Sequence, residues 1–345
     1  MYATLNTAPH RRYNILTGEW ILVSPHRNKR PWQGKKDVAA PAQTIAYDKD
    51  CFLCPDNLRA NGSTNPNYKG VYSFVNDYAA INNHAEYKEY NDGLLTAETE
   101  TGICKVICFS DDHSLTLPLM TASQITAVIQ TWKSEYLQLG AKQDINYVQI
   151  FENKGAIMGC SNPHPHGQIW AHRSVPVEIL KKNKMQQVFW EQNKKSLLSE
   201  YLEQELKCNK RIVLQNEHFV ALVPFWAVWP YEIMILPKNH YQHIGQLSVD
   251  EEKTFAEIIK KVTIKYDNLF ETSFPYSAGI HQCPTDGPAH PEWHFHMLFY
   301  PPLLRSSEVK KFMVGYEMFA TPQRDITAES AANTLRNLKD IHFSL

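Results

Sequence analysis

The sequence predicts an α+β fold in which one continuous, mainly antiparallel sheet is flanked by helices and is built from two copies of the same unit. Two observations carry this prediction. A series of landmarks in the first part of the chain recurs 127 to 130 positions later, which indicates an internal duplication. Short β-forming runs also alternate with patterns of helical period. The 345 residues are enough for two such units, which we place at residues 1–177 and 178–345.

The first landmark is an apolar strand that leads into a loop with a histidine. Residues 106–109 read Val-Ile-Cys-Phe, and His113 follows them. Residues 233–236 read Ile-Met-Ile-Leu, and His240 follows them, 127 positions after His113. Because β-branched and aromatic residues favour strands, the repeat predicts one strand and one histidine loop in each half.

A helix with a capping box follows each histidine loop. Thr121 pairs with Gln124, and Ser248 pairs with Glu251, again 127 positions apart. In a capping box the first side chain accepts a backbone N–H, and the later side chain reaches back to the start of the helix. Both helices continue with apolar residues at helical spacing, which predicts one buried face for each. These apolar positions are Ile125, Val128, Ile129 and Trp132 in the first helix, and Phe255, Ile258, Ile259 and Val262 in the second.

The last landmark is a His-x-His run. His164 and His166 recur as His294 and His296, 130 positions later. Each half is therefore expected to contain a strand, a histidine loop, a helix, a second strand and a His-x-His strand. A polar connector of helical period over residues 177–206 joins the two halves.

Charge and hydropathy exclude several classes of protein. Lys and Arg number 35 against 36 for Asp and Glu, so no global charge favours nucleic acid or an anionic membrane as a partner. No apolar run approaches the roughly 20 residues that cross a bilayer. Residues 1–13 are polar and lack the apolar core of a signal peptide. We therefore expect a cytoplasmic protein that binds neither nucleic acid nor a membrane.

Fifteen histidines and seven cysteines point to metal binding or catalysis rather than to a disulfide framework. Cys51 and Cys54 have the Cys-x-x-Cys spacing with which two thiolates bind one tetrahedral ion. His113 and His164 are the candidates for the two remaining ligands, so we predict a structural zinc site. The alternative is a redox dithiol, which is typical at the start of a helix after a strand, whereas Pro-Asp-Asn follows Cys54 here.

Residues 159–168 read Gly-Cys-Ser-Asn-Pro-His-Pro-His-Gly-Gln, and this run contains the candidate catalytic side chains. Alternate residues of a strand share one face, so we expect His164, His166 and Gln168 to project side by side. If His164 binds a metal, the neutral imidazole of His166 is left free as a nucleophile toward phosphorus. The amide of Gln168 and the hydroxyl of Ser161 would then donate to a phosphoryl oxygen. The alternative is a solvated histidine cluster without a role.

No P-loop and no Gly-x-Gly-x-x-Gly run is present, so a phosphate must be bound by residues other than a glycine-rich loop of these types. Arg27, Lys29 and Arg30 form a cationic candidate, although a short basic run is usually a solvated loop. Asn76 and Asp77 suit a ribose diol or a base edge, and they fit a turn equally well.

The run from Phe151-Glu-Asn-Lys-Gly155 through His164-Pro-His-Gly-Gln168 resembles the galactose-1-phosphate uridylyltransferase family, a branch of the histidine-triad superfamily. The likeness extends over essentially the whole chain. It includes residues 24–32, 51–54, 266–277, 299–306, 311–317 and 323–325. It implies two histidine-triad-like halves whose antiparallel sheet forms a half-barrel.

The resemblance implies a ping-pong exchange. UDP-glucose would uridylylate His166 and release glucose 1-phosphate, and galactose 1-phosphate would then take the uridylyl group to give UDP-galactose. The resemblance further implies that Cys51, Cys54, His113 and His164 hold one zinc ion per chain, and that Gln168 steadies the phosphoryl group.

The resemblance also assigns the binding residues and a partner. The residues implied at the UDP site are Arg27, Arg30, Asn76, Asp77, Asn153, Gly159, Cys160 and Ser161. The residues implied to contact the sugar phosphate are Lys311, Phe312, Val314, Gly315, Tyr316, Glu317 and Gln323. In the family the second set comes from the partner subunit, so a homodimer is implied. Without the resemblance, residues 311–317 would pass for an ordinary amphipathic segment.

One part of the family pattern fails in this chain. Many members bind a second metal, often iron, through a glutamate and three histidines. His281 and His296 match two of these positions, but the glutamate position holds Lys182 and the third histidine position holds Leu298. A lysine cannot serve as a carboxylate ligand, and leucine has no donor atom.

Two nearby residues are candidate substitutes at this second site, Glu178 and His294. Because two ligand positions have changed, we nevertheless expect one zinc and little or no iron per chain.

Two other functions are compatible with the same residues. One is a histidine-triad hydrolase or phosphorylase that acts on a dinucleotide polyphosphate or an adenylylated sugar. The other is a zinc-stabilised nucleotide-binding module without turnover.

Overall fold

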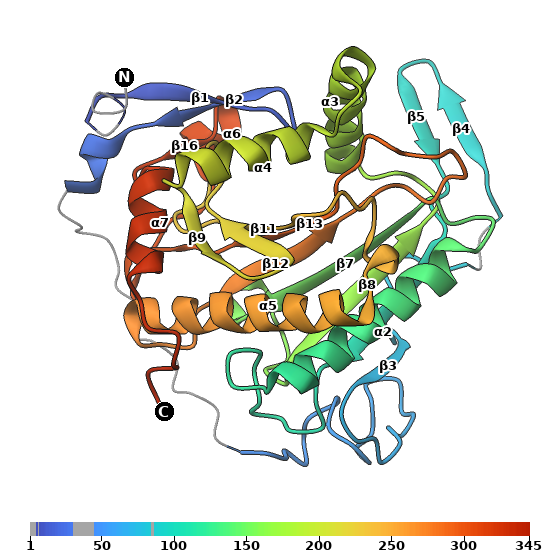
Figure 1. The fold of residues 1–345 in the computed structure, drawn as a ribbon. Coiled ribbons are helices and arrows are strands. Elements are labelled where there is room, and N and C mark those ends of the chain that lie inside the picture. Colours follow the sequence, from blue (N-terminus) through green and yellow to red (C-terminus); the bar gives the residue numbers. More distant parts are fainter. Residues whose placement is uncertain (1–4, 6, 30–44, 84–85) are drawn as a thin grey trace.

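A nine-stranded sheet forms the centre of the computed structural model, which describes residues 5, 7–29, 45–83 and 86–345 (Figure 1). The strands lie in the order β3-β6-β8-β7-β12-β13-β11-β10-β9, and every neighbouring pair is antiparallel. Their bounds in this order are Tyr72–Val75, Gly102–Cys108, His166–His172, Tyr147–Lys154, Tyr276–His281, His296–Tyr300, Ile233–Pro237, Phe219–Leu222 and Ile212–Gln215. The predicted single antiparallel sheet is confirmed.

The strand order also confirms the duplication. Read outward from the junction of β7 and β12, the first half contributes β7, β8 and β6, and the second half contributes β12, β13 and β11. These are equivalent elements in the two sequence repeats. Because β7 pairs with β12, the two copies join edge to edge into one sheet. Both His-x-His runs therefore lead into inner strands of this sheet, which begin at His166 and at His296.

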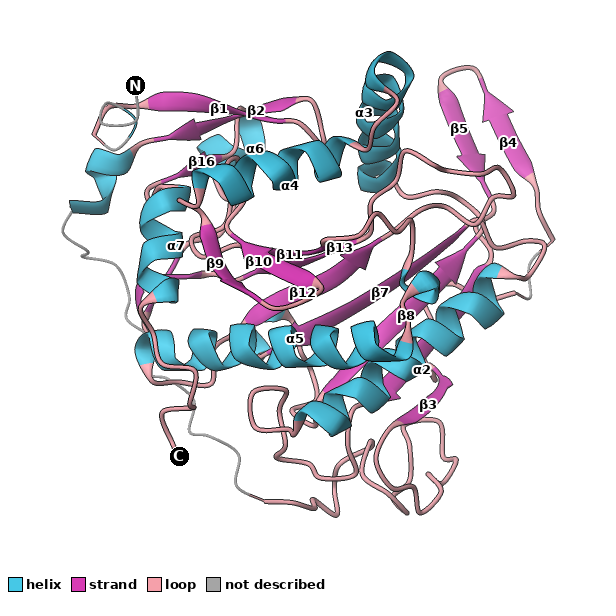
Figure 2. Ribbon diagram, in the orientation of Figure 1, coloured by secondary structure: helices cyan, strands magenta, loops and turns pink. Residues whose placement is uncertain are grey.

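Two long helices cover one face of the sheet and lie beside each other, α2 (Ala122–Gly140) and α5 (Val249–Phe270) (Figures 1 and 2). Both predicted capping boxes are formed, at Thr121 and at Ser248. All eight apolar residues that define the predicted stripes are buried. They pack with one face of the strands into the main hydrophobic core, so each helix is held by the side that the sequence pattern indicates.

The opposite face is covered only in part. The connector forms two helices, α3 (Val177–Asn193) and α4 (Leu197–Cys208). Leu198 and Leu202 of α4 pack on Met234 and Leu298, which lie on strands of the second half. On β13 this face is buried, whereas on β8 the residues from His166 to His172 alternate between buried and half-exposed. The first half of this face is therefore the part that stays accessible to a ligand.

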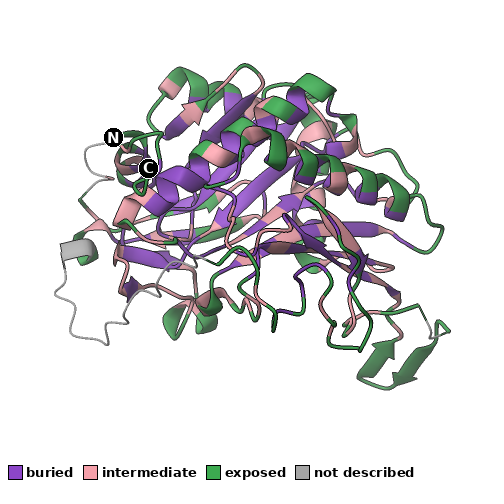
Figure 3. Ribbon diagram, turned by 90° about the horizontal axis from the view of Figure 1, so that it is seen from below, coloured by how far each residue is buried: buried purple, intermediate pink, exposed green. Residues whose placement is uncertain are grey.

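Smaller elements surround the sheet. β1 (His10–Asn14) and β2 (Glu19–Val23) form a three-stranded sheet with β16 (Gln323–Arg324), so segments from the first and the last part of the chain share one small sheet. The hairpin of β4 (Glu89–Asp92) and β5 (Leu95–Glu98) is exposed along its length (Figure 3). The remaining elements are η1 (Pro25–Lys29), η2 (Ala156–Met158), η3 (Ile244–Gln246), β14 (Leu303–Ser306), β15 (Val309–Lys310), α6 (Tyr316–Phe319) and α7 (Ala328–Arg336).

Within the described residues no helix combines the length and the apolar character that a membrane span requires. The division of the chain at residues 177 and 178 stays a prediction.

A buried ion pair fastens the N-terminal strands to the end of the chain, and its loss is expected to be costly. The guanidinium of Arg12 is only 1% exposed and donates to both carboxylate oxygens of Glu329 on α7, at 3.0 and 2.8 Å. Replacing Arg12 with methionine removes one of the two charges that compensate this carboxylate and leaves it with Arg211 alone, at 2.6 Å, so we expect the free energy of unfolding to fall by about 3 kcal/mol. Denaturant unfolding measures it, with Arg11→Met as the control, because Arg11 is an exposed neighbour on the same strand. Equal losses in the two variants would contradict the prediction.

Candidate active site and metal centre

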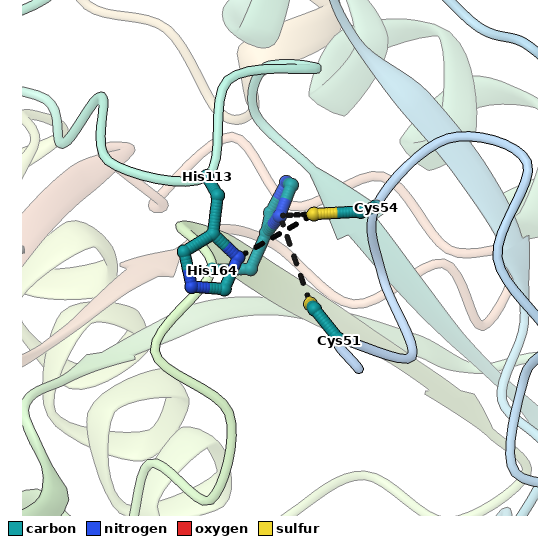
Figure 4. Close-up of side chains that lie close together, drawn as sticks. All are labelled: Cys51, Cys54, His113 and His164. Atoms are coloured by element: carbon teal, nitrogen blue, oxygen red, sulfur yellow. Dashed lines mark hydrogen bonds between the residues drawn. The ribbon is translucent and has the colours of Figure 1, made fainter. Parts of the chain in front are cut away.

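Four side chains from three separate segments meet in a buried cluster, Cys51, Cys54, His113 and His164 (Figure 4). One ligand atom from each lies within 4.8 Å of the others. The Sγ atom of Cys54 is 3.5 Å from Nδ1 of His113 and 3.5 Å from Nδ1 of His164. None of the four residues is more than 5% exposed. The structure thus brings together all four residues that the sequence pattern assigns to a metal.

Hydrogen bonds around the cluster aim the ligand atoms inward. Nε2 of His164 donates to the carbonyl oxygen of Ser110 at 2.8 Å, which leaves the lone pair on Nδ1 directed at the sulfurs. The backbone N–H of Leu53 donates to Sγ of Cys51 at 3.3 Å. The amide of Asn65 donates to the carbonyl oxygens of residues 52 and 54, both at 2.9 Å, and so fixes the turn between the cysteines. No helix begins at this turn, which disfavours the redox alternative.

The protonation states of the cluster fit a metal site. Burial lowers the pKa of His164 to about 4, so its imidazole is neutral, as a ligand must be. Burial raises the pKa of Cys54 to about 11, and a bound cation would reverse this shift by stabilising the thiolate. Two sulfurs and two imidazole nitrogens in one dry cluster are the donors of a closed, four-coordinate metal site.

The imidazole of His166 opens β8 beside this cluster. Its Nδ1–H donates to the carbonyl oxygen of His164 at 2.7 Å, which leaves Nε2 with the free lone pair. Burial lowers the pKa of His166 below its ordinary value, so the ring is neutral near pH 7. A neutral, oriented imidazole on an accessible strand face has the properties of a nucleophile.

One detail of the expected geometry is wrong. His164 was expected to share the strand face with His166 and Gln168, but the strand begins only at His166. Pro165 has no N–H and cannot extend the ladder, although its carbonyl oxygen accepts from the N–H of Phe109 at 3.0 Å. His164 therefore lies before the strand and turns toward the cysteines.

Gln168 lies two residues after His166 and shares its side of the strand. The indole Nε1–H of Trp170 donates to Oε1 of Gln168 at 3.0 Å. Because the carbonyl end of the amide is occupied, the Nε2 end is left to donate to a ligand. Sequence reasoning missed Trp170, although its position two residues after Gln168 places it on the same face.

A second missed residue orients Asn153 on the neighbouring strand β7. Ser277 is the cross-strand partner of Asn153 and donates from Oγ to Oδ1 of Asn153 at 2.7 Å. Asn153 follows Phe151 by two residues, and Phe151 pairs with Gln168. Asn153 and Gln168 therefore lie on the same side of the sheet, each with its amide NH₂ group left over.

The connection from β7 to β8 contains the predicted residues Gly159, Cys160 and Ser161. Gly159 ends η2 with a φ of +81°, a left-handed conformation that glycine adopts without strain. The thiol of Cys160 donates to the carbonyl oxygen of Asn162 at 3.0 Å, and Ser161 is exposed. The loop thus links the strand of Asn153 directly to the strand of His166.

The remaining residues predicted for the nucleotide have partners within the chain. Nε of Arg27 is 3.2 Å from Oδ1 of Asp325. Oδ1 of Asn76 accepts from the N–H of Tyr78 at 3.0 Å, so this residue forms the turn that was one of its two interpretations. Asp77 accepts from Asn61 at 2.7 Å. Arg30 lies outside the described residues.

The residues predicted for the sugar phosphate form an exposed segment and a buried anchor. Lys311 pairs with Glu317, and the ring of Phe312 meets Trp229 edge-on at 6.4 Å. Val314 and Tyr316 are each 57% exposed. Gly315 has a φ of +54° where α6 begins.

Gln323 forms the buried anchor of this set. It donates from Nε2 to Oδ1 of Asp325 at 2.7 Å, the same oxygen that Arg27 contacts. The two predicted binding sets are therefore joined through one carboxylate.

The second metal site of the family pattern does not fit a metal here. The amine of Lys182 lies 2.5 Å from Nδ1 of His281 and 3.1 Å from Nε2 of His296. Neither candidate substitute reaches this pair. Glu178 bonds to Lys181 at 3.0 Å, and both ring nitrogens of His294 have other partners. In the described part of the chain, Cys51, Cys54, His113 and His164 form the group of three or more potential ligands whose atoms lie close enough to share one ion.

Comparisons with known proteins give a consistent result for both halves. The family model described as galactose-1-phosphate uridyl transferase, N-terminal domain, matches residues 1–176, and the corresponding C-terminal domain model matches residues 181–345.

Two curated relatives named galactose-1-phosphate uridylyltransferase are similar over nearly their full length. The Haemophilus influenzae protein is 50% identical over 336 residues, which is 97% of this chain and 96% of the relative. The Rattus norvegicus protein is 47% identical over 351 residues, which is 100% of this chain and 92% of the relative.

Solved structures share the fold. One described as the structure of uridylyltransferase has a TM-score of 0.75 and 25% identity, and the match covers 94% of this chain and 97% of that one. An ADP-glucose phosphorylase from Arabidopsis thaliana with bound ADP-glucose also has a TM-score of 0.75, covering 96% of this chain and 100% of that one. At 23% identity, the second likeness shows the fold alone.

Proposed function

The chain belongs to the galactose-1-phosphate uridylyltransferase family, and from this premise we propose that it exchanges a uridylyl group between UDP-glucose and galactose 1-phosphate by way of His166. The chain is a nucleotidyltransferase of galactose metabolism, as are the relatives by name. The observation that supports His166 as the nucleophile is its free Nε2 on the accessible half of the sheet, with Nδ1–H held by a backbone carbonyl.

The exchange proceeds in two displacements at the α-phosphorus. Nε2 of His166 attacks the phosphorus of UDP-glucose, a P–N bond forms, and the bond to the bridging oxygen breaks, so that glucose 1-phosphate leaves with the electron pair. A phosphate oxygen of galactose 1-phosphate then attacks the uridylyl-imidazole and releases His166 with UDP-galactose as the product. The carbonyl of His164 holds the Nδ1 proton throughout and stabilises the positive charge that develops on the ring.

The phosphoryl oxygens gain negative charge during both displacements, so donors that face them stabilise the transition state. The amide of Gln168 is oriented to donate because Trp170 occupies its carbonyl oxygen. The amide of Asn153 is oriented in the same way by Ser277. We assign Ser161 and the backbone of the loop from Gly159 to the same oxygens.

The proposal extends to the metal and to the other binding residues. Cys51, Cys54, His113 and His164 would hold Zn²⁺, since its preferred tetrahedral set is one of thiolates and imidazoles. A closed set of four protein ligands gives the ion a structural role, in which it holds the backbone of His164 in place. The UDP site would include Arg27, Arg30, Asn76, Asp77, Asn153, Gly159, Cys160 and Ser161, and the sugar phosphate would contact residues 311–317 and Gln323.

The exposure of Val314 and Tyr316 is compatible with a homodimer in which this segment serves the neighbouring subunit. Sedimentation measures the oligomeric state, and a mixture of His166→Ala with a variant of residues 311–317 would regain activity if the site is shared.

Isotope exchange tests the proposed function against the two alternatives. With glucose 1-phosphate labelled in the sugar, label is expected to enter UDP-glucose in the absence of galactose 1-phosphate, because the first displacement is reversible. A hydrolase or phosphorylase would instead transfer the nucleotidyl group to water or phosphate, and a binding module would show no exchange. Transfer to galactose 1-phosphate as the main reaction supports the proposal.

We predict that Trp170 acts as a positioning residue for Gln168. Trp170→Phe keeps an aromatic ring but removes the Nε1–H, so the amide of Gln168 loses its fixed orientation. We expect the rate constant of uridylylation in a single turnover to fall about tenfold while KM for UDP-glucose changes little, since only the transition state needs the donor.

A double-mutant cycle separates this role from packing. Trp170→Phe is expected to have no further effect when Gln168 is already alanine. Trp190→Phe on α3 is the matched control. Full additivity of the Trp170 and Gln168 effects would contradict the prediction.

A further inference from the structure

A buried lysine amine lies between two histidines on the covered half of the active face. Lys182 of α3 is 4% exposed and reaches the sheet at His281, the last residue of β12, and His296, the first residue of β13. Its Nζ atom is 2.5 Å from Nδ1 of His281 and 3.1 Å from Nε2 of His296. His281 and His296 are cross-strand partners, and their rings meet edge to face with centroids 5.5 Å apart.

Both imidazoles present lone pairs to this amine. Nδ1–H of His296 donates to the carbonyl oxygen of His294 at 2.9 Å, so Nε2 is the acceptor. Burial, and then the nearby Lys182 amine, hold the pKa values of His281 and His296 well below the ordinary value, which keeps both rings neutral. The amine therefore donates to the two nitrogen atoms that a metal ion would need as ligands.

The internal repeat shows what the second half has kept and what it has lost. His164 and His294 each donate from Nε2 to a backbone carbonyl oxygen. The next histidine in each run donates from Nδ1 to the backbone carbonyl oxygen of the first. The ring centroids of His113 and His164 are 5.3 Å apart, and those of His240 and His294 are 5.4 Å apart.

The partners of these rings differ between the halves. In the first half Nδ1 of His164 faces the sulfur of Cys54. In the second half Nδ1 of His294 bonds to the hydroxyl of Ser199 at 3.0 Å. A serine hydroxyl is a poor substitute for a thiolate ligand, so His240 and His294 form no second copy of the metal cluster.

We propose that the amine of Lys182 takes the position of a metal ion, so that the pair of His281 and His296 is held without a metal and helix α3 is fastened to β12 and β13 by hydrogen bonds. A cation that entered this pair would have to displace the amine from both nitrogen atoms at a buried site. The next side chain on the same side of β13 is Leu298, which has no donor atom. The second half is therefore independent of metal, in contrast to the first.

Metal content of the purified full-length protein tests the proposal. Wild type dialysed against excess Fe²⁺ or Zn²⁺ is expected to retain about one ion per chain, and the double variant Lys182→Glu with Leu298→His is expected to retain about two. Adding His281→Ala to the double variant is expected to return the content to about one, which locates the second ion. A folded double variant that holds only one ion would overturn the proposal.

A measurement on single variants covers the case in which the double variant does not fold. His281→Ala alone is expected to have the same metal content as wild type, because His281 bonds to an amine and not to an ion. Cys54→Ala is the positive control for loss of metal. If His281→Ala lowers the metal content of the protein, or if wild type holds near-stoichiometric iron, the proposal is wrong.

Discussion

Replacing His166 with alanine is expected to lower the rate of uridylyl transfer by about 10⁴-fold or more, because both displacements need its Nε2 atom. The fold should survive the change. His166 is only partly buried, and its hydrogen bond to the carbonyl of His164 is formed at the edge of the site rather than in the core. Substrate binding should also survive, since the predicted contacts to UDP come from other residues.

The measurement is the formation of an acid-labile adduct from UDP-glucose labelled in the uridylyl group. Wild type is expected to form the adduct, and His166→Ala is expected to form none. His172→Gln is a suitable control because His172 lies on the same side of β8, where it contacts Glu100 rather than the reacting groups. An adduct in His166→Ala, or its absence in wild type, would show that the nucleophile is misassigned.

Breaking the Cys51–His164 cluster is expected to have the second-largest effect. In Cys54→Ala one sulfur is lost, and the three remaining groups hold a metal much more weakly. A loss of about 3 kcal/mol or more in the free energy of unfolding would lower the melting temperature by about 5 °C or more. Transfer activity should fall too, because the backbone of His164 holds the proton on Nδ1 of His166.

Three measurements check this result: the metal content, the melting temperature and the single-turnover rate. Cys208→Ala is the control, since Cys208 is a partly buried thiol outside the cluster. Removing the metal from wild type with a chelator should reproduce the defects, and adding Zn²⁺ back should reverse them. Unchanged stability in a metal-free Cys54→Ala protein would exclude a structural role for the ion.

The architecture follows from patterns that are local in the sequence. The capping boxes at Thr121 and Ser248 form as predicted because a hydroxyl and an amide or carboxylate three residues apart satisfy the same free N–H groups wherever a helix begins. The apolar stripes are buried because a helix has one side that must leave water. The repeat at 127 to 130 positions then identifies the equivalent strands, and antiparallel pairing at β7 and β12 unites them.

The four residues of the buried cluster could also be predicted from the sequence. The Cys-x-x-Cys spacing is one with which two sulfurs bind the same ion, and only a few histidines belong to the repeated pattern. Spacing alone was less successful at His164, because Pro165 has no N–H to donate to the ladder and the strand begins only at His166. The catalytic assignment of His166 rests on the motif and on family resemblance, and it stays a prediction.

By itself, the sequence determined the duplication, the single antiparallel sheet and the helix starts, because each depends on residues a few positions apart or on a repeated pattern. The Cys-x-x-Cys spacing and the histidine landmarks also identified the four residues of the buried cluster. Only the tertiary structure decided which amide is oriented by Trp170 or Ser277, and which half of the face stays open. It also decided that the amine of Lys182 lies where a second metal would bind. These features depend on side chains from distant segments that meet across strands and helices, and their hydrogen bonds exist only once the sheet has formed.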